Sequence, residues 1–181
     1  MSQVINDIHR EHQNISRLMR LLQTQVDLFK ESGVPDWELV RDALRYMLDW
    51  PDRYHHPKED RVLAQLKIKA PEFSNAAESI QEQHRELADL SRKFADAVEQ
   101  VLHDETLEKD WFVGIAEDYI EHQIHHMNIE ETEFLPAAEE ILSSDDWSAI
   151  DADLEHADDP LFGKRAEERF EMLRDMIKGG S

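Results

Sequence analysis

The amino-acid sequence predicts an all-α protein, an up-down-up-down four-helix bundle with an additional C-terminal helical segment. Apolar residues recur at steps of three and four over most of the 181 residues, which is the spacing of amphipathic helices. Only five glycines and six prolines interrupt this pattern. The connections between the predicted helices are short, and short connections favour antiparallel neighbours.

The first predicted helix covers residues 4–30, where the apolar stripe is unbroken. It ends at residues 32–35, Ser-Gly-Val-Pro, a combination that stops helices. The second predicted helix covers residues 37–67 and contains Pro51 and Pro57. Because each proline lacks a backbone N–H and crowds the preceding turn, we expect a kink around them.

Two further helices complete the predicted bundle. Residues 70–74, Ala-Pro-Glu-Phe-Ser, separate the second helix from a third at residues 75–102. Residues 103–106 lead into a fourth helix at residues 107–142. We therefore assign residues 1–142 to the four-helix bundle.

Residues 143–181 form a predicted C-terminal helical extension. The run Ser-Ser-Asp-Asp-Trp at its beginning is typical of a helix start. After Pro160, one more apolar stripe consists of Phe162, Ala166, Phe170, Leu173 and Ile177. The sequence leaves open whether this extension docks on the bundle as a lid or supports a homodimer.

The composition excludes several classes of function. Twenty basic and 41 acidic side chains give a net charge of -21, which repels phosphate backbones and anionic lipids, so we expect neither nucleic acid nor a membrane as a partner. Without cysteine, thiolate-bound zinc, iron–sulfur clusters and disulfides are excluded, and any metal must be held by nitrogen and oxygen. Because no uncharged run approaches the ~18 residues that span a bilayer, we expect a cytoplasmic protein.

Six polar side chains occupy core positions in the apolar stripes of the four predicted helices. They are His12, His55, Glu59, His84, His126 and Glu130. In so acidic a chain, pairs of histidine and acid four residues apart arise by chance. More informative are the positions of these residues within the buried stripe of each helix and their level along the bundle axis. Counted from the end where the first and third helices begin, His12 and His84 lie ~13 Å into the bundle, and the other four fall at a similar level.

Burying that many polar groups without partners would cost several kcal/mol each. For any one of these residues alone, a hydrogen-bonded network of histidine and glutamate, or an isolated core histidine, is a sufficient explanation. Six such residues in one layer favour a metal site. Imidazole and carboxylate without sulfur suit iron, manganese or zinc, and two carboxylates among four imidazoles suit a dinuclear centre. Ferritin-like proteins use Glu-x-x-His pairs, whereas the stripe positions here carry His-x-x-x-Glu.

Taken together, these residues resemble the hemerythrin-like, HHE cation-binding domain family over about residues 4–142. His12 is similar to the single histidine of that family's first helix, and His84 to the lone ligand of its third helix. Residues 55–60, His-His-Pro-Lys-Glu-Asp, resemble its second-helix signature. Residues 126–131, His-Met-Asn-Ile-Glu-Glu, resemble its fourth-helix signature.

The sequence departs from oxygen-carrying hemerythrins in two respects. Their third helix supplies two histidines one turn apart, whereas apolar residues lie one turn to either side of His84. Their fourth-helix acid comes five residues after its histidine, a spacing that here would select Glu131 in place of Glu130. His122, one turn before His126, is a candidate for the missing fifth histidine, and its alternative role is that of a core residue or an outer neighbour of the site.

The resemblance implies a pair of iron ions bridged by oxygen or carboxylate, with zinc or manganese as substitutes. We expect the protein to bind a small oxidant, dioxygen, peroxide or nitric oxide, in sensing, storage or oxidative-stress defence. The alternative is a di-iron oxidoreductase, a peroxidase or nitric oxide reductase, with His56 and Tyr54 near the centre. A third reading is a structural bundle with an inert zinc. Apart from that alternative, we expect His9 and His56 to be solvated surface residues. We expect Tyr54 and Tyr119 to have a packing role.

Overall fold

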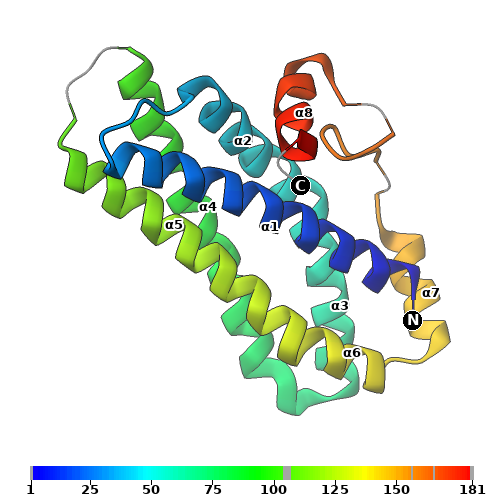
Figure 1. The fold of residues 1–181 in the computed structure, drawn as a ribbon. Coiled ribbons are helices and arrows are strands. Elements are labelled where there is room, and N and C mark those ends of the chain that lie inside the picture. The colour runs from blue at the N-terminus through cyan, green and yellow to red at the C-terminus, as the bar shows by residue number, and fades with distance from the viewer. Residues whose placement is uncertain (1, 104–106, 156, 165, 180–181) are drawn as a thin grey trace.

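The computed structural model describes residues 2–103, 107–155, 157–164 and 166–179, and it confirms the all-α class (Figure 1). No β-strand occurs within these ranges. The α-helices are α1 (Gln3–Lys30), α2 (Trp37–Trp50), α3 (His56–Lys69), α4 (Ser74–Leu102), α5 (Lys109–Ile129), α6 (Leu135–Ile141), α7 (Ser144–Asp153) and α8 (Glu171–Gly179). Short 3₁₀ turns lie at Pro71–Phe73 and Glu168–Phe170, and turns of π-helix at Pro51–His55 and Glu130–Phe134.

Local sequence explains where these helices begin. The side chain of Ser2 accepts a hydrogen bond from the backbone N–H of Ile5 at the start of α1, and Asp36 does the same for Leu39 at the start of α2. Such N-caps satisfy backbone donors that have no partner within the helix. Ser143 begins α7 with a capping box, as the run at residues 143–147 predicted.

The second and fourth predicted helices are each divided by a turn of π-helix. The irregularity expected around Pro51 and Pro57 is the π turn between α2 and α3. The π turn at Glu130–Phe134, between α5 and α6, was not predicted. A π turn holds one residue more than an α turn and changes which side chains face inward beyond it.

The core consists of two apolar clusters with the polar layer between them. Leu22, Phe94 and Phe112 belong to the larger cluster, and Val62 and Phe134 to the smaller one. The four long helical segments of the bundle are α1, α2 with α3, α4, and α5 with α6. Each contributes apolar residues to both clusters and polar residues to the layer between them. The common height inferred for the six polar side chains is therefore what the packing shows, whereas the alternation of helix directions stays a prediction.

The C-terminal extension lies against the bundle, with α7 beside α1 and α3 and α8 beside α2 and α1 (Figure 1). Leu161, Phe170 and Leu173 are buried in the larger apolar cluster. The stripe predicted from Phe162 onward is not one helix, because Phe162 lies in a turn and the helical residues begin at Glu168. A homodimer stays a prediction. No helix within the described residues is both long and apolar enough to cross a membrane.

Candidate metal centre

The structure brings the six core polar residues of the sequence together. His12 comes from α1, Glu59 from α3 and His84 from α4, while the two π turns supply or adjoin the rest. All six side chains are buried, and the two glutamates are fully enclosed. They are His12, His55, Glu59, His84, His126 and Glu130.

Glu59 lies at the middle of the layer and faces histidines on both sides. Its Oε1 is 3.0 Å from Nε2 of His12 and 3.3 Å from Nε2 of His55. Its Oε2 is 3.4 Å from Nε2 of His84. The two oxygens of one carboxylate therefore face two different sets of imidazole nitrogens.

Glu130, in the π turn between α5 and α6, also lies close to several of these histidines. Its Oε2 is 3.2 Å from Nε2 of His126 and 3.3 Å from Nε2 of His12. Its Oε1 is 3.6 Å from Nε2 of His84. Like Glu59, it spans the space between the two sets of histidines.

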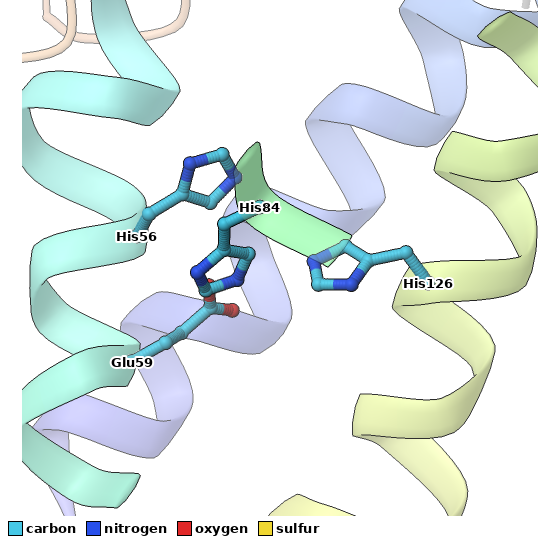
Figure 2. Close-up of side chains that lie close together, drawn as sticks. All are labelled: His56, Glu59, His84 and His126. Carbon is cyan, nitrogen blue, oxygen red and sulfur yellow. The ribbon is translucent and has the colours of Figure 1, made fainter. Parts of the chain in front are cut away.

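His56 was expected to be solvated, and the structure corrects this. It is buried, and its ring stacks on that of His84 with centroids 4.1 Å apart and planes 15° apart. Figure 2 shows His56, Glu59, His84 and His126 close together, and each offers one ligand atom within 4.8 Å of the others'. The π turn at Pro51–His55 is the reason, since its extra residue lets the consecutive His55 and His56 both face inward.

His122, the candidate fifth histidine, does not join the layer. Its side chain is exposed, and its Nδ1 donates a hydrogen bond to the backbone oxygen of Asp118 at 2.7 Å. The inward position one turn after Tyr119 belongs instead to Gln123, which is buried. From Tyr119 the buried face of the helix advances four residues to Gln123, and not three residues to His122.

Two histidines turn Nε2 inward because carboxylates hold their outer nitrogen. Nδ1 of His12 lies 2.7 Å from Glu131, and Nδ1 of His55 lies 2.9 Å from Glu11. Lys58 in turn donates to Glu11 at 2.5 Å. Glu131, which the sequence offered as an alternative ligand, therefore contacts the outer face of a histidine, and Glu11 and Lys58 were missed.

The other histidines have different outer partners. Nδ1 of His126 donates to Oε1 of Gln83 at 3.1 Å, and Nδ1 of His84 lies 3.8 Å from Asp60. Hydrogen bonding at Nδ1 leaves the Nε2 lone pair free for a metal and fixes the ring's orientation, as is usual for metal-bound histidine. No spacing rule reveals such partners in advance, because they lie on different helices.

In the polar layer, neighbouring carboxylates and imidazoles shift each other's pKa values toward the charged forms. Burial alone would lower the pKa of His12, but the nearby carboxylates of Glu130, Glu131 and Glu59 outweigh burial and hold it well above its ordinary value. His84 behaves alike, since the central carboxylates overcome burial and raise its pKa to about 10. Burial would raise the pKa of Glu59, but the surrounding imidazoles lower it well below its usual range. Protonated imidazoles thus balance the central carboxylates.

His56 and His126 respond in the opposite direction. Burial is the largest influence on both, and it lowers the pKa of His56 and brings that of His126 to about 4. Both rings are therefore neutral near pH 7. A neutral imidazole is the form that binds a metal ion.

The donor set fits metal ions, because buried atoms remain without hydrogen bonds. Within the polar layer, these atoms are Nε2 of His56, His84 and His126, Oε2 of Glu59, and both carboxylate oxygens of Glu130. An unsatisfied buried polar atom costs about 1–3 kcal/mol, and more when it is charged. Among the described residues, two groupings have ligand atoms close enough together to hold a metal ion. Both contain Glu59, one with His56, His84 and His126 and the other with His12 and His55.

The family model described as the hemerythrin HHE cation binding domain matches residues 3–138. The chain belongs to this family. Neither curated proteins nor solved structures gave a significant match. The hemerythrin-like domain thus contains a buried cluster of histidine and glutamate that is able to hold a metal.

The remaining candidates have simpler roles. His9 donates to Glu131 at 2.9 Å and is partly exposed. Tyr54 packs on Trp50 with ring centroids 4.6 Å apart. Tyr119 is fully buried in the larger apolar cluster.

Proposed function

We propose that the protein holds two iron ions and binds a small oxidant, dioxygen, peroxide or nitric oxide, in sensing, storage or oxidative-stress defence. The observation that carries the proposal is the position of Glu59, shared by two groupings of ligand atoms. Two ions bridged by carboxylates account for both groupings. Nitrogen and oxygen ligands suit iron, and they also accept zinc or manganese as substitutes.

The chain's own residues determine which ligands reach the centre. A bound ferrous pair supplies electrons to an oxidant, one from each ion. Glu59 and Glu130 are fully enclosed, and apolar clusters lie above and below them. Bulky substrates are therefore excluded, and the low-polarity surroundings strengthen every charge interaction within the layer.

Anaerobic loading tests the proposal. Apoprotein supplied with ferrous iron and then mixed with oxygen is expected to show a ligand-to-metal charge-transfer band that disappears on deoxygenation. His55→Gln should weaken or abolish the band, whereas His103→Gln, at an exposed helix end, should keep it. An iron-loaded protein with no spectral response to oxygen, peroxide or nitric oxide would overturn the proposal.

The alternative function is a di-iron oxidoreductase, a peroxidase or nitric oxide reductase. In the sequence, the missing fifth histidine ligand and the nearby His56 and Tyr54 favoured this alternative. In the structure, His56 lies within a ligand grouping and the Tyr54 ring packs on Trp50, so this geometry gives the enzyme no separate support. Many turnovers of hydrogen peroxide or nitric oxide per centre would favour the enzyme, and stoichiometric consumption would favour the binding protein.

A further inference from the structure

A hollow on the surface of the bundle is lined by hydrogen-bond donors. It has a volume of about 480 Å³ and lies between α1 and α5, which are side by side (Figure 1). Five donor side chains line it, and they are Gln13, Ser16, Arg17 and Arg20 of α1 and Asn128 of α5. Of these five, within the described part of the chain, only Arg17 has a side-chain hydrogen bond, to the amide oxygen of Asn14 at 2.8 Å. The other donors are available to a ligand in the hollow.

The two arginines of this hollow are unusual for so acidic a chain. Several other arginines contact an acidic side chain, namely Arg10, Arg41, Arg45, Arg85, Arg92 and Arg169. Arg17 and Arg20 form no ion pair with any residue that the structure describes. The sequence explains this, because no acidic residue occurs between Glu11 and Asp27 on α1. Two positive charges therefore stay uncompensated at one edge of the hollow.

Glu131, the acidic residue that lines the hollow, is occupied by other partners. It lies at the end of the hollow near His9 and His12, whose Nδ1 atoms are 2.9 Å and 2.7 Å from its Oε1. Arg17 lies about 12 Å along α1 from His9. Exposed charges at such a separation are largely screened at physiological salt. Glu131 therefore neither neutralises the arginines nor strongly repels an anion bound beside them.

We propose that this hollow binds the phosphate group of a small phosphorylated molecule at Arg17 and Arg20. A guanidinium offers parallel N–H donors that match two phosphate oxygens. The neutral side chains of Gln13, Ser16 and Asn128 add donors for the remaining oxygens. A phosphate monoester carries more acceptor oxygens and more charge than a carboxylate, so it uses this donor set more fully. The site needs no metal ion, and the inference is independent of the proposed function.

The hollow also has an apolar wall, which indicates a ligand with an organic part. It is larger than an inorganic phosphate ion, and Ile124 and Met127 line it beside the donors. Ile124 is 43% exposed, so its side chain can contact a ligand. The net charge of -21 repels extended polyanions such as nucleic acids. A small phosphate ester with an apolar body fits these features.

Calorimetric titrations at constant ionic strength test the site, with inorganic phosphate and phenyl phosphate as the probes. Wild type should bind both, and phenyl phosphate more tightly. The double variant Arg17→Gln/Arg20→Gln should bind both more than about tenfold more weakly, because charged hydrogen bonds are lost. The matched control is Arg85→Gln/Arg92→Gln, which removes the same charge from exposed positions on α4 and should match wild type.

A single substitution tests the apolar wall. Ile124→Ser should leave the affinity for inorganic phosphate unchanged and remove the preference for phenyl phosphate. Equal affinities of wild type for the two probes would overturn the assignment of an organic part to the ligand.

The remaining outcomes decide whether the phosphate site exists. Wild type that binds neither probe, or a double arginine variant that binds like wild type, would overturn the proposal. Phosphate also binds metal ions, so the titrations are repeated after treatment with a chelator. Binding that disappears with the metal would place phosphate elsewhere and overturn the proposal. Should the double variant fail to fold, NMR of wild type decides, because phosphate should shift amide signals at residues 13–20 and 124–128, and shifts confined to other residues would contradict the site.

Discussion

Each histidine of the centre has its own outer partner, and these partners differ in charge. Carboxylates hold His12 and His55, whereas the neutral amide of Gln83 holds His126. A carboxylate at Nδ1 makes the imidazole a stronger donor to a cation than an amide does. The imidazoles of His12 and His55 are therefore stronger donors to a cation than that of His126.

Glu11→Gln tests this outer layer. The change should lower metal affinity about 10–100-fold, because the amide holds His55 less firmly and Lys58 loses its charge partner. Competition against a chelator of known affinity measures the effect. Glu121→Gln, an exposed change of the same kind on α5, is the control. Affinity within twofold of wild type would show that Glu11 does not support the centre.

Metal binding should release protons. In the metal-free protein His84 has a pKa of about 10 and the pKa of His12 is raised well above its ordinary value, so both are protonated at pH 7. Ligands must be neutral, so loading at pH 7 should release about two protons, and affinity should rise with pH from 6 to 8. Calorimetry in buffers of different ionisation enthalpy counts the protons. Release near zero would contradict the assigned charges.

At the scale of elements, both π turns share a local cause. The N–H of His56 donates to the oxygen of Pro51, and the N–H of Leu135 to that of Glu130, each five residues back. In both cases the next residue is a proline, Pro57 or Pro136. A proline cannot donate and crowds the carbonyl four residues earlier, which a wider turn relieves.

Pro57→Ala should separate stability from function. Alanine restores a backbone donor, so the metal-free protein should melt no lower than wild type. The turn can then tighten, which would rotate His56 out of the layer and lower metal affinity about tenfold. Pro71→Ala, in a 3₁₀ turn away from the centre, is the control. Unchanged affinity in Pro57→Ala would show that this π turn does not position the ligands.

Across the whole molecule, the sequence located site residues wherever a polar side chain occupies a position in a periodic apolar stripe. The histidines at positions 12, 84 and 126 could be found that way, because an uninterrupted α-helix keeps phase over many turns. His56 could not, because a π turn shifts the phase beside it. The prediction that His122 faces the centre was wrong for a related reason. In the sequence a step of three or of four residues from Tyr119 is equally compatible with a helix, and in the structure the inward position belongs to Gln123. The outer partners depend on how helices are placed against each other, which one sequence does not reveal.

Removing metal should destabilise the whole domain. The metal-free layer encloses carboxylate and imidazole atoms without hydrogen bonds, and cations bind only the folded arrangement. At free metal a hundredfold above Kd, binding adds about 2.7 kcal/mol, or about 5–10 °C in Tm for a chain of this size. Scanning calorimetry with and without a chelator measures the shift. Equal melting temperatures would mean that the layer is satisfied without metal.

A count of metal ions per chain tests directly whether the layer holds an iron pair. Apoprotein reconstituted anaerobically with ferrous iron, desalted and examined by elemental analysis should retain two irons. Glu59→Ala, which removes the carboxylate common to both ligand groupings, should retain one or none. Wild-type protein that retains no iron, or only a single ion, would show that the layer is not a di-iron centre.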